Sequence, residues 1–206
     1  MNKLAQLIDQ HPNLFEAFPG KSNPKSVREA LKRLPVVTPS SGLGRDHLRP
    51  IMIAKREASL SRVLDENTEG RIREVSRNAF AYAKVEASAD AIRTLKDGLA
   101  NVGVSIASAV LSWAYSDTYP VIDRHAWRTF EHVGGESSAA ARRGSFTVDH
   151  YVRFKELIDQ HVSKSRPSRS AAEIDFWMYA YSRVFLGSLN ERYVHDWGQQ
   201  LVRSPT

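Results

Sequence analysis

Apolar residues recur at helical spacing along most of this 206-residue chain. Two stretches, residues 67–84 and 170–185, place apolar side chains on one face of a 3.6-residue repeat. Those side chains are Ile72, Val75, Ala79 and Ala83 in the first stretch, and Ile174, Trp177, Met178, Tyr181, Val184 and Phe185 in the second. Sustained period-two alternation, which marks a half-buried strand, is absent from the sequence. The pattern predicts an all-α fold of roughly eight helices.

Polar residues ahead of these stripes are expected to start helices. They are the capping boxes Ser26–Glu29 and Ser170–Glu173, the pair Asn67–Thr68, and Ser88. A side-chain oxygen at such a position accepts a hydrogen bond from a free N–H of the first helical turn. A further helix is expected to be capped by Asp46 and to run to Leu64, with a kink at Pro50.

Residues 35–44 are rich in proline, glycine and serine, a composition typical of a loop or linker. We therefore expect an N-terminal helical arm and linker in residues 1–45, followed by one all-α domain in residues 46–206. Within that domain, residues 134–145 are small, polar and basic, which predicts a mobile surface loop. Residues 164–169 are expected to form a second basic loop.

The stretch from Leu95 to Phe130 predicts two helices joined by a tight turn at residues 101–103, and then a third helix behind Asp123. The turn reads Asn-Val-Gly, and asparagine and glycine most readily accept left-handed backbone angles. The helix that begins at Val104 should therefore present its free N–H groups to solvent. Such a helix N-terminus binds a phosphate without any side chain.

Composition narrows the possible functions. The formal charge of +6 and the isoelectric point near 9.6 favour a polyanionic partner, although many basic proteins bind no nucleic acid. The absence of cysteine excludes disulfides, thiolate zinc sites and cysteine-ligated iron–sulfur clusters. The seven histidines form no helical pair at metal-ligand spacing, so no metal is expected. Without a secretory or membrane-spanning segment, the protein is expected to be cytoplasmic.

The stretch resembles the helix-hairpin-helix DNA glycosylase superfamily. The family pattern is a Leu-Pro-Gly-Val-Gly hairpin, a helix rich in small residues, and a Pro-Val-Asp-like turn that carries a catalytic aspartate. Here these parts are residues 99–103 (LANVG), residues 104–112 (VSIASAVLS) and residues 119–125 (YPVIDRH). The departures are Ala100 for the proline and Asn101 for the first glycine.

The resemblance implies that Asp123 is the catalytic acid. It also places the Schiff-base lysine of bifunctional members on Ser105, which precedes Asp123 by 18 positions, as expected for the endonuclease III and adenine-mismatch branches. A serine there is similar to the monofunctional mismatch glycosylases. The implied function is hydrolysis of the N-glycosidic bond of a damaged or mismatched base in duplex DNA.

The same resemblance implies two helical subdomains with a cleft between them, in a monomer associated with the nucleoid. Expected DNA contacts come from the hairpin, Arg124 and the basic loops, namely Asn101, Gly103, Val104, Arg124, Arg142, Arg143 and Arg169, with Lys164 and Arg166 in the same loops. In the family, the hairpin carbonyls can also hold a monovalent cation. No other cofactor is required. The second essential acid of the mismatch branch has no counterpart that the sequence identifies, and neither has the wedge residue that fills the gap left by a flipped base.

Each candidate residue has a second interpretation. Asp123 can serve only as the N-cap of the helix that follows it, and Ser105 can be a small residue that lets its helix pack closely. The hairpin can be an ordinary turn between helices. Two other functions therefore stay open: a DNA-binding module without catalytic activity, and an all-α interaction protein without a DNA role.

Overall fold

A computed structural model describes residues 3–12, 14, 40–56, 59–164 and 169–186 of the chain, and every regular element in these ranges is a helix. The helices are α1 (Lys3–Gln10), α4 (Arg45–Arg56), α5 (Leu60–Glu66), α6 (Glu69–Lys84), α7 (Ser88–Gly98), α8 (Val104–Ala114), α9 (Arg124–His132), α10 (Ala139–Arg142), α11 (Val148–Lys164) and α12 (Ala171–Phe185). The prediction of an all-α fold is confirmed. The capping box at Ser26 lies outside the described residues.

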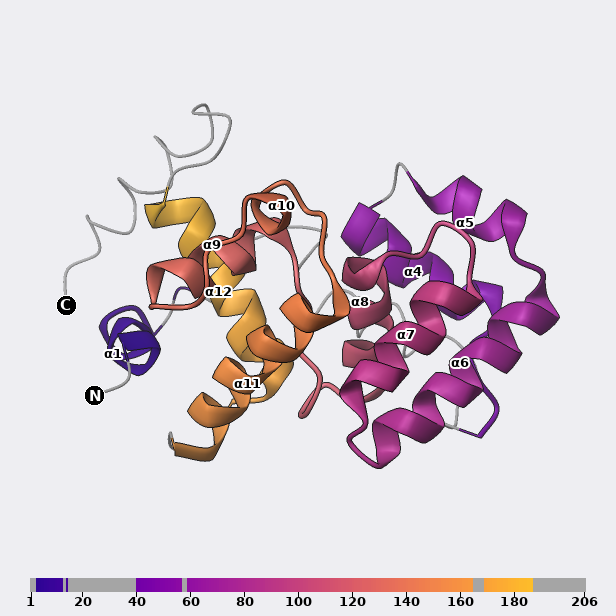
Figure 1. The fold of residues 1–206 in the computed structure, drawn as a ribbon, viewed down its shortest axis with the longest axis horizontal. Coiled ribbons are helices and arrows are strands. Elements are labelled where there is room, and N and C mark those ends of the chain that lie inside the picture. The colour runs from indigo at the N-terminus through magenta and orange to yellow at the C-terminus, as the bar shows by residue number, and fades with distance from the viewer. Residues whose placement is uncertain (1–2, 13, 15–39, 57–58, 165–168, 187–206) are drawn as a thin grey trace.

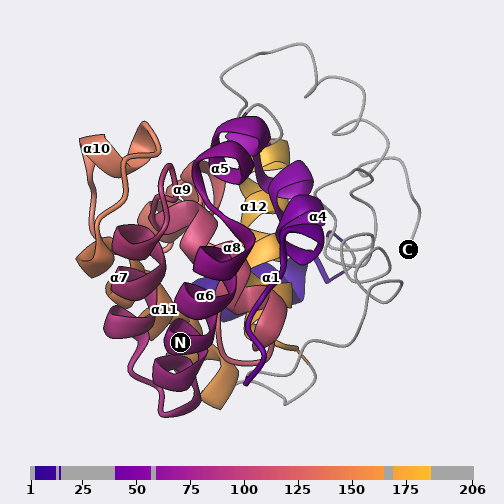
Figure 2. The same ribbon diagram turned by 90° about the vertical axis from the view of Figure 1, so that its right-hand side faces the viewer.

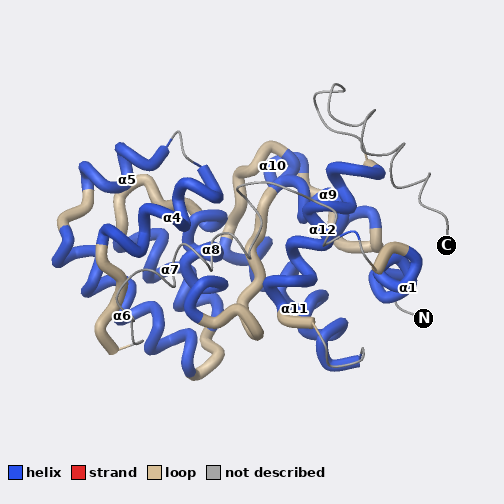
Figure 3. The backbone as a smooth tube through the Cα atoms, turned by 180° about the vertical axis from the view of Figure 1, so that it is seen from behind, coloured by secondary structure: helices blue, strands red, loops and turns tan. Residues whose placement is uncertain are grey.

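The helices gather in two groups along the long axis of the molecule. Helices α4 to α7 lie on one side and α9 to α12 on the other, with α1 beside α12, and α8 runs between the groups (Figures 1 and 2). Seen from behind, loops connect the two groups, and the described backbone contains no strand (Figure 3). Because α8 is contacted from several directions, eight of its eleven residues are buried. A helix that is apolar on all sides belongs in a protein interior.

Several expected helix starts are confirmed and two are wrong. Thr68 caps α6 by accepting a hydrogen bond from the N–H of Arg71, and the Ser170 capping box opens α12. Ser88 is instead the first residue of α7, whose N-cap is Ala87. Asp46 lies in the first turn of α4 and not before it. Acidic residues in a first turn still favour the helix, because its N-terminus carries partial positive charge.

The expected helix from Asp46 to Leu64 is two helices. Helix α4 ends at Arg56 with Pro50 inside it, and α5 begins at Leu60. The segment predicted as a loop between residues 134 and 145 likewise contains the short helix α10, whose cap is Ser138. Both differences concern helices of one to three turns, for which apolar spacing over a long window is a poor guide.

Helix α1 packs against the end of the molecule formed by α9 and α12. Leu4 and Ile8 of α1 belong to the main hydrophobic core, and the indole N–H of Trp177 donates to the carbonyl of His11. Lys3 donates to the carbonyl of His132. The first part of the expected arm is therefore packed against α9 and α12, whereas Leu43 and Arg45 at its other end donate to Ser76 and Glu69 of α6. Among the described helices, none has the length and apolarity needed to cross a membrane.

Candidate active site between the hairpin and α12

The turn between α7 and α8 lies where it was expected, but only one of its two predicted residues has a left-handed backbone conformation. Asn101 is left-handed, with φ 60°, whereas Gly103 has φ −88° and serves as the N-cap of α8. Gly103 is therefore not needed for its backbone freedom. A Cβ atom added at Gly103 would have no other atom within 4 Å. The structure would therefore accommodate a side chain at position 103, although the residue there is glycine.

A buried asparagine fixes the start of the turn. The Asn67 amide donates to the carbonyls of Val63 (2.7 Å) and Ala100 (3.0 Å), and its oxygen accepts from the N–H of Ala100 (2.9 Å). This side chain is 3% exposed and joins the end of α5 to the hairpin. The sequence indicated Asn67 only as part of a helix start.

Side chains from three helices hold the turn that precedes Asp123. The Ser105 hydroxyl donates to the carbonyl of Ile122 (2.7 Å), and the Ser108 hydroxyl accepts from the N–H of Ile122 (3.1 Å). The N–H of Val121 donates to the carboxylate of Asp175, which comes from α12. The Tyr151 hydroxyl of α11 donates to the carbonyl of Pro120 (3.3 Å). Ser105 thus acts as a structural residue in the position where the resemblance places a lysine.

The two carboxylate oxygens of Asp123 have separate partners. Oδ1 caps α9 by accepting from the N–H groups of His125 (2.8 Å) and Ala126 (2.9 Å). Oδ2 lies 3.2 Å from Nζ of Lys55, which comes from α4. The N-cap interpretation is therefore confirmed, and 24% of the side chain stays exposed. Asp123 therefore caps a helix and still has a partly exposed side chain that lines the cavity.

Burial and charge act in opposite directions on Asp123. Burial raises the pKa of its carboxyl, but the Lys55 ammonium and the hydrogen bond from Ala126 outweigh burial, so the pKa lies below its ordinary value. The group is consequently a carboxylate at neutral pH. An ionised carboxylate is the form that can stabilise positive charge on a bound molecule.

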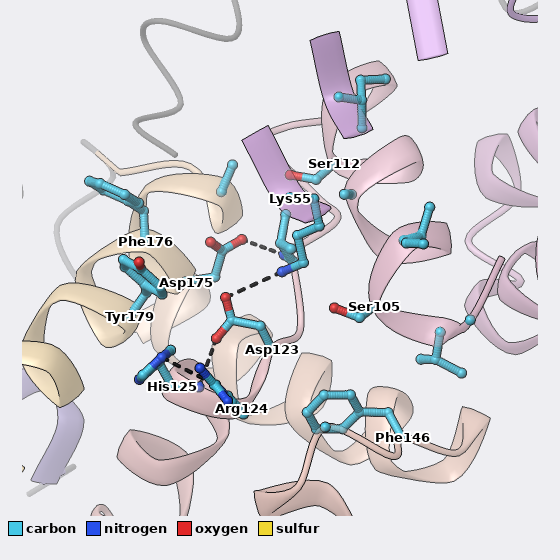
Figure 4. A pocket seen from close by; sticks show the side chains of 18 of the residues that line it. Lys55, Ser105, Ser112, Asp123, Arg124, His125, Phe146, Asp175, Phe176 and Tyr179 are labelled. Carbon is cyan, nitrogen blue, oxygen red and sulfur yellow. Dashed lines mark hydrogen bonds and ion pairs between the residues drawn. The ribbon is translucent and has the colours of Figure 1, made fainter. Parts of the chain in front are cut away.

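A cavity of about 700 Å³ lies between α4, the hairpin, α9 and α12. Seven residues that the sequence analysis singled out line it, namely Asn101, Gly103, Val104, Ser105, Asp123, Arg124 and Arg143. The close-up shows Lys55 pointing towards Asp123, with Ser105 to one side and Asp175 to the other (Figure 4). The volume lies within the range of roughly 300–1,000 Å³ that is usual for small-molecule pockets.

Two of the expected DNA contacts do not line this cavity. Arg142 ends α10 and pairs with Glu131 at 2.8 Å. Arg169 donates to the carbonyl of Pro12 (3.1 Å), at the end of the molecule where α1 packs. The side chain of Lys164 and all of Arg166 lie outside the described residues.

Aromatic rings form another wall of the cavity. Phe176 and Tyr179 stack with centroids 5.9 Å apart, and His125 meets Tyr179 edge-on at 5.3 Å. Burial lowers the pKa of His125 to about 4. The nearby Asp123 carboxylate raises this pKa, whereas the Arg183 guanidinium lowers it further. The imidazole is therefore neutral at pH 7, and its buried Nδ1 has no hydrogen-bond partner among the described atoms.

The three tryptophans in the described part of the chain divide between the core and this cavity. Trp127 and Trp177 are fully buried, and for Trp177 the apolar stripe of residues 170–185 predicts this. Trp113 of α8 is only partly buried and lines the cavity near α4. Its ring lies 6.1 Å from that of His47.

Sequence reasoning missed Lys55 and Asp175. Lys55 lies on a helix with no recognised motif, and Asp175 sits within the apolar stripe of α12, where it is 6% exposed. A carboxylate inside an apolar stripe was the available signal, because a buried charge needs a specific partner. Among the described residues, no group of three or more histidine and acidic side chains could hold a metal ion.

No protein-family model, no curated protein and no solved structure matches the chain.

Proposed function

We propose that this protein binds duplex DNA and hydrolyses the N-glycosidic bond of a damaged or mismatched base, in the manner of the helix-hairpin-helix DNA glycosylases. The observation that carries the proposal is that the hairpin and the partly exposed side chain of Asp123 line one cavity. A sugar–phosphate strand lying on the hairpin would bring a nucleotide to that carboxylate. The two groups of helices would be the two subdomains, and the cavity would be part of the cleft between them.

The carboxylate suits this reaction. Breaking a base–sugar bond develops positive charge on the sugar ring, as in glycoside hydrolysis. Asp123 is held in place by its bonds to the first turn of α9 and is ionised at neutral pH. A fixed negative charge stabilises the cationic transition state without further reorganisation, and it can orient the attacking water.

The hairpin would bind the phosphates. No side chain caps the N-terminus of α8, so its first N–H groups are available to an anion. The open space at Gly103 would admit a phosphate close to the backbone. Arg124 and Arg143, both exposed on the cavity wall, would add positive charge. The carbonyl of Gly103 already accepts bonds from the N–H groups of Ile106 and Ala107, so a hairpin cation would use the other hairpin carbonyls.

The aromatic wall would receive the flipped base. An extruded base is held in such enzymes by stacking on aromatic side chains and by polar contacts to its edge. Phe176 and Tyr179 line the cavity with nearly parallel rings, and the partly exposed ring of Tyr179 would supply the stacking face.

The test is base excision by the wild type and by Asp123→Asn. Duplexes carrying uracil, mismatched adenine, 8-oxoguanine or alkylated bases would be incubated with protein, and abasic sites developed with alkali. We expect wild-type protein to process at least one lesion, and Asp123→Asn to lose about 100-fold or more in rate, since asparagine keeps the cap but not the charge. Asp90→Asn, an exposed residue of α7, is the control and should keep full activity. Failure on every lesion, or full activity of Asp123→Asn, would reject the enzymatic proposal.

One observation favours a second function, a DNA-binding module without hydrolytic activity. The Lys55 ammonium partly neutralises the carboxylate that hydrolysis needs. A module of this kind would bind duplex with a steep salt dependence, show no preference for damaged DNA and leave every lesion intact.

A further inference from the structure

We infer that Asp175 is a positioning residue of this site. Its buried carboxylate on α12 holds the acid turn, residues 119–123, so that Asp123 faces the sugar of a nucleotide in the cavity. The inference rests on the role proposed for Asp123 in hydrolysis. It adds a second acid that acts through the turn and not on the reacting bond.

A charge is unexpected at the position of Asp175. The residue lies in the apolar stripe of α12, next to the fully buried Ile174, and is itself 6% exposed. A buried carboxylate costs free energy unless specific partners satisfy it, whereas an apolar side chain of similar size would pack there without that cost. The carboxylate at this position therefore calls for a role beyond filling the core.

The acid turn supplies one partner of this carboxylate. Asp175 accepts a hydrogen bond from the N–H of Val121, which precedes Asp123 by two positions, and its carboxylate is directed towards the turn (Figure 4). A hydrogen bond to an ionised acceptor is stronger than one between neutral groups. On the other side, Ser105 and Ser108 of α8 bond to the backbone of Ile122. The turn is therefore held between α8 and α12.

This hold determines where Asp123 lies relative to the hairpin. The bonds of Oδ1 to α9 set the orientation of the carboxylate, and the bonds of Val121 and Ile122 set the place of the turn that carries it. Without the acceptor on α12, Asp123 should stay capped and ionised but move away from the sugar. A displacement of about 1 Å at a reacting centre can cost about 100-fold in rate. Phosphate binding by the hairpin should not change.

The test compares the affinity of the protein for two abasic analogues in duplex DNA, and it needs no base excision. One analogue is a neutral tetrahydrofuran ring. The other is a pyrrolidine ring whose protonated nitrogen carries the positive charge that develops on the sugar. A correctly placed carboxylate favours the charged ring, so we expect wild-type protein to bind it about tenfold or more tighter. Asp175→Ala should lower this preference to about twofold or less and leave the affinity for the neutral ring unchanged.

Two conservative variants separate position from charge. Asp175→Asn loses the charge but keeps an oxygen that can accept from the N–H of Val121, so it should keep most of the preference. Asp175→Glu keeps the charge but moves the acceptor by one methylene, so it should lose the preference as alanine does, and it serves as the test if the alanine variant does not fold. Asp90→Ala, an exposed acid of α7 that pairs with Arg93, is the control and should bind like wild type. Thermal unfolding shows which variants are folded.

A wild-type preference in Asp175→Ala, equal losses in the alanine and asparagine variants, or no preference in the wild type would overturn the inference. Loss in the alanine and glutamate variants with retention in Asp175→Asn, but without excision of any lesion, would support the role of Asp175 and reject the hydrolytic proposal. Excision at equal kcat by wild type and Asp175→Ala would do the reverse. A lower kcat at unchanged KM in Asp175→Ala would support both.

Discussion

Asp123 illustrates how one side chain can hold two roles at once. Its Oδ1 satisfies two N–H groups of α9, and its Oδ2 is left for Lys55 and the cavity. The cap fixes the orientation of the carboxylate, because rotation would break both backbone bonds. The two interpretations that the sequence left open for this residue are therefore compatible, and substitution by asparagine separates them, since asparagine caps as well as aspartate does.

The lowered pKa of the buried His125 imidazole should make the stability of the protein depend on pH. Its pKa of about 4 in the folded protein lies below the unfolded value of 6.5, so the unfolded chain binds the proton first and stability falls as the pH drops from about 6.5 towards 4. Between pH 7 and pH 5, this residue should remove about 2 kcal/mol of unfolding free energy. Urea unfolding at both pH values should show a smaller loss in His125→Gln by that amount. An equal loss in both proteins would contradict the buried neutral imidazole.

A substitution at Gly103 should change DNA binding while leaving the stability of the fold nearly unchanged. Gly103→Asp puts a favourable N-cap at the start of α8, in open space and at an ordinary φ, so folding should change by at most about 1 kcal/mol. Its negative charge would repel a phosphate at the hairpin, and duplex affinity should fall by about tenfold or more. Fluorescence anisotropy with labelled duplex measures the affinity.

The matched control is Ala87→Asp, which puts the same charge at the N-cap of α7, an eleven-residue helix, away from the hairpin. That distance is about 16 Å along the helix axis. Comparable weakening in both variants would mean that the hairpin has no particular part in binding.

The residues that the sequence revealed are those whose role is local. Asp123 and Gly103 stand in a short motif and could be read from spacing alone. Lys55 reaches Asp123 across 68 positions, and Asp175 reaches Val121 across 54. No periodicity in one helix encodes such contacts, since they arise only when α4 and α12 pack on either side of the turn. The motif therefore identified Asp123, whereas its partner Lys55 and the contact of Asp175 with the acid turn depend on tertiary packing.

At the scale of elements, the site is a turn and a hairpin held by side chains. The predicted stripe of α6 is buried in full, whereas that of α12 is buried only as far as Tyr181, because Val184 is partly buried and Phe185 is 43% exposed at the end of the helix. The division between α4 and α5 was missed, since apolar positions continue across it and Pro50 lies within α4 and not at its end. The hydrogen bonds that lock the hairpin and the acid turn come from polar residues that carry no periodic signal.

The hydrogen bonds of Asn67 should contribute measurably to the free energy of unfolding. Asn67→Ala removes three hydrogen bonds that join α5 to the hairpin, and should lower the unfolding free energy by about 2 kcal/mol. Chemical denaturation measures the change. Asn78→Ala, an exposed position of α6, should stay within about 0.5 kcal/mol of wild type. If the two variants unfold alike, the hairpin does not depend on Asn67.

At the scale of the molecule, positive charge concentrates where the two groups of helices meet. The basic side chains on the cavity wall are Lys55, Arg124, Arg143 and Arg183, against the two acids Asp123 and Asp175. The overall charge of +6 would draw DNA to the protein, and this local excess would direct it to the cavity. The contribution of overall charge and that of the cavity residues to DNA affinity can be distinguished by how the affinity of each variant depends on salt concentration.

Arg143→Ala should weaken duplex binding and reduce the slope of log affinity against log salt by about one, because one phosphate contact is lost. Arg93→Ala removes the same charge from the exposed face of α7, where Arg93 pairs with Asp90, and should leave the slope unchanged. Binding isotherms at several salt concentrations give both slopes. Equal slopes for all three proteins would place the DNA elsewhere.

Trp113 gives the cavity an optical signal of its own. Trp127 and Trp177 are sealed in the core, so their emission is insensitive to events at the surface, whereas the indole of Trp113 borders the space that a nucleotide would fill. Displacing water from that indole would shift its fluorescence to shorter wavelength, and stacking with a base would quench it. Among the tryptophans of the described residues, Trp113 is thus the probe that distinguishes a ligand inside the cavity from one held on the outer surface.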